Sequence, residues 1–129
     1  MSTKFATHLW ERALERRRAR REQLRREFLH AVGNALAELS HQIAFTEASI
    51  FGSLTRPESF SEESNIDIAF VGLRDEDFFR ALAFLSRRLA RDVDIVQLER
   101  HPRKAQILQE GIPTRSSSKI SMPKRSSVS

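Results

Sequence analysis

No proline interrupts the first 56 residues of this 129-residue chain, and hydrophobic residues recur there at helical spacing. Five of them follow one another at intervals of three or four positions and therefore share one helical face: Leu24, Phe28, Val32, Leu36 and Leu39. The spacing predicts one long helix, or two consecutive helices, over residues 7–42. Gly33 and Asn34 mark the point where such a helix could bend.

The net charge of +5 is unevenly distributed along the chain. Residues 11–27 hold eight Arg and four Glu, a balance of +4, whereas residues 28–114 hold nine basic and thirteen acidic side chains, a balance of −4. Residues 115–129 carry +4 and Lys4 the last +1. The Arg-rich segment reads as a solvated helix face or as a docking surface for an acidic partner. Nucleic acid is the weaker alternative, because the core is acidic and no aromatic residue is interleaved with the arginines.

Three short apolar segments, at residues 44–51, 65–71 and 93–98, read as strands. In the second, the even-numbered side chains face one side of the strand, and the odd-numbered ones, Asn65, Asp67 and Ala69, face the other. A helix is predicted over residues 75–91, and a last short helix begins at Pro102 and ends near Gly111. The order of elements predicts a small α/β or α+β sheet with helices on one face.

Composition divides the chain into three parts: an Arg-rich helical segment at residues 1–43, a core at 44–113, and a tail at 114–129. The tail holds seven Ser and no acid, so we expect it to be disordered. The absence of Cys excludes disulfides and thiolate metal sites. No run approaches the ~18 apolar residues of a membrane span, and no apolar signal core is present near the N-terminus, so we expect a cytoplasmic protein without a membrane segment.

Polar residues with metal- and phosphate-binding chemistry cluster around the predicted strands. Gly52 and Ser53 follow the first strand, Asn65 and Asp67 open the second, and Asp94 lies early on the third. Residues two apart on a strand point the same way, and Asp94 reaches the same point if its strand lies alongside. Clustered carboxylates repel one another unless a cation lies between them, and an oxygen ligand set suits Mg²⁺.

The Gly-Ser turn can bring backbone N–H groups and a hydroxyl close to phosphate oxygens, and Arg56 is placed to add a charge-assisted contact. This combination predicts metal-assisted transfer of a nucleotidyl group. Structural explanations stay open: Asp67 could end a turn or pair with an Arg, Asn65 could be a turn-forming residue, and Arg56 could be a solvated loop charge. The four His share no ligand spacing, so none is assigned a role.

The runs Phe51-Gly52-Ser53-Leu54-Thr55-Arg56 and Ser64-Asn65-Ile66-Asp67-Ile68-Ala69-Phe70 resemble the signature of the minimal nucleotidyltransferases of the polymerase-β superfamily. That signature is Gly-Ser, an Arg, a loop, and then Ser-Asp-x-Asp leading into an apolar strand. Val93-Asp94-Ile95-Val96 is similar to the strand that carries the family's third carboxylate, and the stretch to Glu110-Gly111 to its closing helix. The resemblance covers residues 44–112.

The resemblance implies a nucleotidyltransferase-like mixed β-sheet flanked by helices, with a long N-terminal helix added here. It implies Mg²⁺ as cofactor and ATP or another nucleoside triphosphate as substrate. Asp67, Asp94 and Asn65 would be the catalytic and metal-binding positions, and Gly52, Ser53 and Arg56 would bind the nucleotide. Many minimal members are antitoxins that add AMP to a Tyr of a helical HEPN-type toxin, and because this chain has no Tyr, such an acceptor would lie on a partner.

Two positions depart from the family pattern. Asn65 stands where the family has the first Asp of its pair, which keeps one oxygen ligand but loses the negative charge. Pro57 stands where the family usually has Gly and stiffens the loop. Two hypotheses follow: an Mg²⁺-dependent nucleotidyltransferase, or a catalytically degenerate relative that acts as a partner-binding module. The sequence leaves the oligomeric state open.

Overall fold

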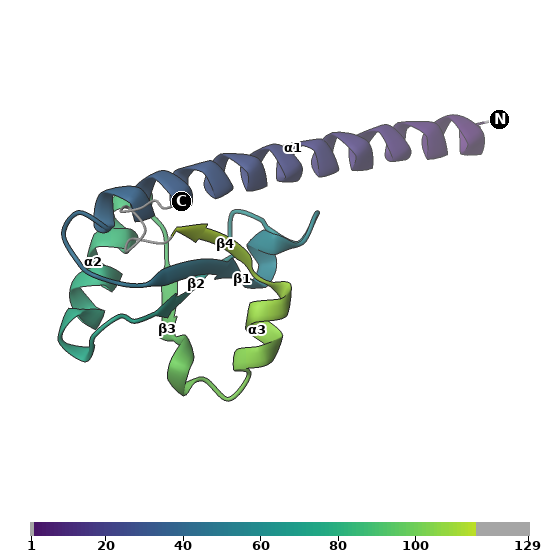
Figure 1. Ribbon diagram of the computed structural model, residues 1–129. Coiled ribbons are helices and arrows are strands. Elements are labelled where there is room, and N and C mark those ends of the chain that lie inside the picture. The colour runs from purple at the N-terminus through teal and green to yellow at the C-terminus, as the bar shows by residue number, and fades with distance from the viewer. Residues whose placement is uncertain (1, 116–129) are drawn as a thin grey trace, which may run out of the picture.

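The computed structural model describes residues 2–115 (Figure 1). Along the chain its helices, strands and 3-10 turns (η) are α1 (Ser2–Leu39), β1 (Glu47–Phe51), η1 (Gly52–Thr55), β2 (Ile66–Val71), η2 (Asp75–Asp77), α2 (Phe78–Leu89), β3 (Val93–Gln97), η3 (Leu98–Arg100), α3 (Lys104–Glu110) and β4 (Ile112–Arg115). The predicted elements are present with shifts of a few residues at their ends. Residues 116–129, most of the predicted tail, lie outside the described part of the chain.

The four strands form one mixed sheet in the order β3-β2-β1-β4. β1 runs antiparallel to both β2 and β4, whereas β2 and β3 are parallel. β4 was not predicted, and its pairing with β1 continues to Arg115, opposite Ala48. β4 contains Pro113, which has no N–H to donate, and β4 tolerates it as an edge strand.

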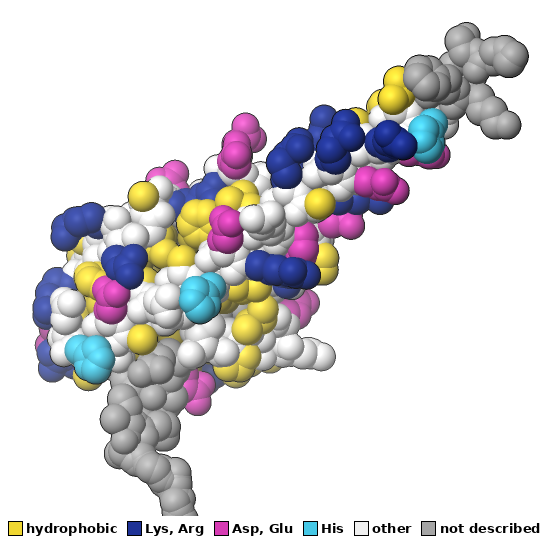
Figure 2. Space-filling model, turned by 90° about the horizontal axis from the view of Figure 1, so that it is seen from above, with side chains coloured by type: hydrophobic (Ala, Val, Ile, Leu, Met, Phe, Trp, Pro, Cys, Tyr) yellow, Lys and Arg dark blue, Asp and Glu magenta, His cyan; other side chains and the backbone are white. Residues whose placement is uncertain are grey.

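α1 is one continuous helix of 38 residues. It passes through Gly33 unbroken, and a Cβ at that position would meet nothing within 4 Å. The predicted apolar stripe is confirmed: Val32, Leu36 and Leu39 are fully buried in the main core, and residues nearer the N-terminus pack against its edge. The N-terminal half extends past the sheet (Figure 1), and Figure 2 shows basic side chains along it. No helix within residues 2–115 is long and apolar enough to cross a membrane.

Helices cover both faces of the sheet, which corrects the prediction that they share one face. The main core lies between one face and helices α1 and α2, and it includes the even-numbered residues of β2: Ile66, Ile68 and Phe70. On the opposite face Ala69 packs with Leu98 and with Ile107 of α3. Ile107 is the one buried residue of α3, so the sequence of this short helix has no apolar stripe to indicate which face it covers.

Candidate active site

Three polar side chains meet where β2 and β3 begin. Asp67 and Asp94 are register partners on these parallel strands, so their side chains point to the same face of the sheet. Asn65 lies two residues before Asp67, and its Nδ2 donates a hydrogen bond to Oδ2 of Asp94 at 3.3 Å. Asp67 is half-buried, whereas Asn65 and Asp94 are exposed. The structure therefore brings together the three residues that the sequence singled out.

The Gly52 turn lies directly against the Asp67 carboxylate. β1 ends at Phe51, which pairs with Asp67 across the sheet, and Gly52 then adopts a φ of 79°. A Cβ on Gly52 would lie 3.1 Å from Cγ of Asp67 and closer still to its Oδ2. Only a residue without a side chain permits this approach and this backbone conformation together. The carboxylates and the turn thus form one continuous site.

The electrostatics of the site favour a bound cation. Burial, and then the negative charge of Asp94, raise the pKa of Asp67 above its ordinary value. A divalent ion between the two carboxylates would relieve their repulsion. Two carboxylates with an amide oxygen fit Mg²⁺, which usually keeps several waters. Asn65 now offers its amide hydrogens to Asp94, so its Oδ1 reaches a shared ion only after the amide turns over.

With Asn65 in place of an acid, the candidate site holds only two carboxylates. Within residues 2–115, no group of three or more His, Cys, Asp or Glu side chains is arranged to hold a metal ion. The site has two carboxylates and an amide, whereas the family that the sequence resembles has three carboxylates. Any metal would therefore be held with one negative charge fewer.

The Gly-Ser turn is fixed from behind by the long helix. Within η1, Thr55 Oγ1 donates to the carbonyl of Gly52 at 2.7 Å, and Leu54 is fully buried in the main core. Arg25 of α1 donates through Nε to the carbonyl of Leu54 at 3.0 Å and through a terminal nitrogen to that of Thr55 at 3.5 Å. Arg25 belongs to the segment that the sequence presented as a solvated face or docking surface, and no sequence signal distinguished it from its neighbours.

A cavity of about 410 Å³ opens beside the turn. It is lined by Phe51, Gly52, Arg56, His101, Arg103, Gln106, Ile107 and Glu110. Arg56 lines this cavity together with Gly52, and its contact with phosphate stays a prediction. The sequence indicated a closing helix up to Glu110 but assigned no site role to residues 101–110, because they gather beside the turn only when α3 packs on the sheet.

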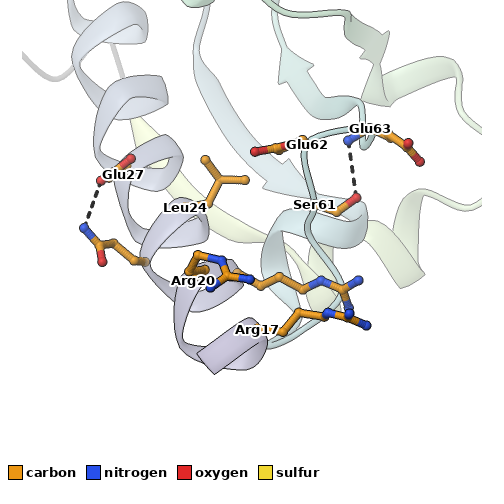
Figure 3. A pocket seen from close by; sticks show the side chains of 9 residues that line it. Arg17, Arg20, Leu24, Glu27, Ser61, Glu62 and Glu63 are labelled. Carbon is orange, nitrogen blue, oxygen red and sulfur yellow. Dashed lines mark hydrogen bonds between the residues drawn. The ribbon is translucent and has the colours of Figure 1, made fainter. Parts of the chain in front are cut away.

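A larger cavity, of about 680 Å³, lies between α1 and the loop that carries Ser61, Glu62 and Glu63 (Figure 3). Its α1 wall includes Arg17, Arg20 and Arg21, none of which forms an ion pair with another residue of the described chain. None of the three site residues Asn65, Asp67 and Asp94 lines it. This cavity therefore has a lining of mixed charge that is separate from the three candidate site residues.

Comparison with known proteins places this geometry in a fold class. No family model matches the chain, and no curated protein matches it. Solved structures do match: a chain of a toxin–antitoxin crystallised with AMP-PNP is 22% identical, over 65% of this chain and 73% of that chain, with a TM-score of 0.56. A chain of the toxin–antitoxin MntA-HpeT, in a mutant with two Asp-to-Glu substitutions, is 21% identical over 65% and 72%, with a TM-score of 0.54.

These likenesses establish the fold of the chain. It is a nucleotidyltransferase-like mixed sheet flanked by helices, as predicted, with a long N-terminal helix. The same fold occurs in chains of toxin–antitoxin proteins.

Proposed function

We propose that this protein is an Mg²⁺-dependent nucleotidyltransferase that transfers AMP from ATP to a partner protein, as the antitoxin of a toxin–antitoxin pair. The observation that carries the proposal is the pairing of Asp67 with Asp94 in register on parallel strands, directly against the Gly52 turn. Two structures of the same fold belong to toxin–antitoxin proteins, and one of them was solved with AMP-PNP. Because the identity to these structures is low, they support the fold alone, and the proposed activity rests on the site.

Each residue of the site has its own role in the proposed reaction. Asp67 and Asp94 would hold Mg²⁺, with Asn65 as a weaker third ligand, and the bound ion would neutralise charge on the phosphates. The Gly52 turn and the Ser53 hydroxyl would bind phosphate oxygens. The acceptor hydroxyl oxygen bonds to the α-phosphorus, the bond from that phosphorus to the β-phosphate oxygen breaks, and pyrophosphate leaves. The exposed carboxylate of Asp94 takes the hydroxyl proton.

The acceptor belongs to another protein in this proposal. The chain contains no Tyr, so it cannot be its own tyrosine acceptor. We infer a Tyr of a helical HEPN-type toxin as the acceptor, in line with the family that the sequence resembles.

The test is transfer of label from α-labelled ATP, with Mg²⁺, to the protein encoded beside this chain's gene. Wild type should label it, and Asp67→Asn should abolish labelling. Glu47→Gln is the matched control, because Glu47 is an exposed acid that pairs with Val71, at the opposite end of β2 from Asp67. Absence of label with both the wild type and Asn65→Asp would overturn the proposal.

A second function, an inactive partner-binding module, is favoured by the hydrogen bond from Asn65 to Asp94. In that state the amide hydrogens, and not a cation, satisfy the Asp94 carboxylate. The projecting half of α1 then supplies the docking surface, with Trp10 65% exposed and with Arg17, Arg20 and Arg21 in no ion pair within residues 2–115. Label transfer by Asn65→Asp but not by wild type, with both chains binding the partner equally, would establish this function.

A further inference from the structure

The cavity beside the Gly52 turn contains Arg56, which the resemblance implies as a nucleotide-binding residue, and a second arginine that no motif assigns. Arg103 lines it from the segment before α3, and Arg56 from the loop after η1. Neither guanidinium forms an ion pair with another residue in the described part of the chain. Arg100, close by in sequence, is by contrast bound to Asp75 at 3.0 Å. Two unpaired guanidinium groups lining one cavity favour an anion there, because an anion satisfies their donors and reduces their mutual repulsion.

His101 adds a donor whose orientation is fixed. Its Nδ1 accepts a hydrogen bond from the backbone N–H of Arg103 at 3.0 Å. The neutral ring must therefore carry its proton on Nε2, which can donate to a ligand. Glu110 also lines the cavity, but it lies about two helical turns along from Arg103, and its carboxylate accepts from Gln106 at 3.4 Å. His101 and Arg103 thus lie just before α3, whereas Glu110 is its last residue.

The cavity adjoins the carboxylate site at Gly52, although Asn65, Asp67 and Asp94 do not themselves line it. Gly52 lines the cavity and also lies against the Asp67 carboxylate. A ligand that reaches from the carboxylate pair into the cavity must carry a reacting phosphate at one end and further negative charge beyond it. The volume of about 410 Å³ falls within the range of small-molecule sites.

We propose that Arg56, His101 and Arg103 bind the β- and γ-phosphates of a nucleoside triphosphate, an inference that rests on the proposed function. The α-phosphate then lies at Asp67 and Asp94, and the two outer phosphates lie in the cavity. This arrangement makes the cavity the part of the site that distinguishes a triphosphate from a monophosphate. It also holds the leaving pyrophosphate after transfer.

The experiment measures binding of ATP and of AMP to the full chain in MgCl₂ by isothermal titration calorimetry. Arg103→Ala should weaken ATP binding about tenfold, the loss of one charge-assisted contact, and leave AMP binding unchanged. Lys104→Ala is the matched control, since Lys104 is an exposed cation at the next position that does not line the cavity. It should change neither affinity. Circular dichroism checks that both variants fold.

The other possible results test the phosphate site and the proposed activity separately. Unchanged ATP binding by Arg103→Ala, or equal losses for ATP and AMP, would place the outer phosphates elsewhere. ATP binding that depends on Arg103 without any label transfer would retain the phosphate site and reject the proposed activity. Label transfer by Arg103→Ala at the wild-type KM for ATP would retain the activity and reject the phosphate site. A wild-type chain that binds no ATP would overturn both.

Discussion

Replacing Gly52 with Ala tests whether the turn and the Asp67 carboxylate are in direct contact. The new Cβ would lie 3.1 Å from Cγ of Asp67 and closer to Oδ2, so the carboxylate must move. Gly52 also has a φ of 79°, which an Ala adopts only with strain. The contact with Asp67 and the backbone strain both arise from the new Cβ, and removing the Asp67 carboxylate separates the two effects.

The magnitude follows from these two effects. A left-handed backbone costs a residue with a Cβ about 1–2 kcal/mol. Moving the half-buried Asp67 off its rotamer costs about 0.5–1.5 kcal/mol. We therefore expect Gly52→Ala to lower the free energy of unfolding by about 1.5–3.5 kcal/mol, the sum of the two. In an Asp67→Ala background only the backbone cost remains, and the same substitution should lower it by about 1–2 kcal/mol.

Urea denaturation followed by circular dichroism measures both values. Gly33→Ala is the matched control, because a Cβ there meets nothing within 4 Å and the residue lies inside α1. That variant should be more stable than wild type by about 0.5–1 kcal/mol. If Gly52→Ala costs the same with and without the Asp67 side chain, the carboxylate does not lie against the turn, and the geometry of the site is wrong.

Three further predictions concern the same region. Asn65→Asp restores a third carboxylate, so MgCl₂ should raise its Tm, relative to EDTA, more than it raises that of wild type; equal shifts would show that position 65 does not contact the ion. The pKa of Asp67 is raised, so the folded chain holds the proton of this carboxyl more tightly than the unfolded chain does. The stability that the bound proton contributes is therefore present at low pH. It is lost as the pH rises from the ordinary pKa of Asp through the raised pKa of Asp67. Without divalent ions, wild type should therefore lose stability relative to Asp67→Asn over that interval, and a pH-independent difference would contradict the shift. Arg25→Ala should lower the free energy of unfolding by about 1–3 kcal/mol, because the Arg25 side chain is 14% exposed and its loss leaves the η1 carbonyls without their donor. Arg26 is the control: its side chain is 76% exposed, so Arg26→Ala should stay within about 0.5 kcal/mol of wild type.

The sequence predicted the parts of the fold that depend on periodicity. Helical spacing identified the buried face of α1, and alternation in β2 separated the core residues Ile66 and Ile68 from Asp67. The same alternation placed Asn65 beside Asp67, and the structure brings Asp94 next to them through parallel pairing with β3. These predictions succeed because each follows from a local repeat that the backbone geometry imposes.

Other features depend on contacts between distant segments and leave no local signal. β4 contains Pro113, which reads as the end of structure, and only its pairing with β1 makes it a strand. α3 buries one residue, Ile107, so its face could not be assigned. Arg25 has the same residue type as its exposed neighbours, and it differs only because the turn at Leu54 folds back beneath it.

The length of α1 has a mechanical consequence. A helix of 38 residues is about 57 Å long, and an α-helix bends little over that distance. Its C-terminal turns are clamped in the core, and Arg25, near the middle, grips the carbonyls of η1. A load on the projecting end near Trp10 would therefore act on Arg25 and, through it, on the carbonyls of η1, the turn that follows β1.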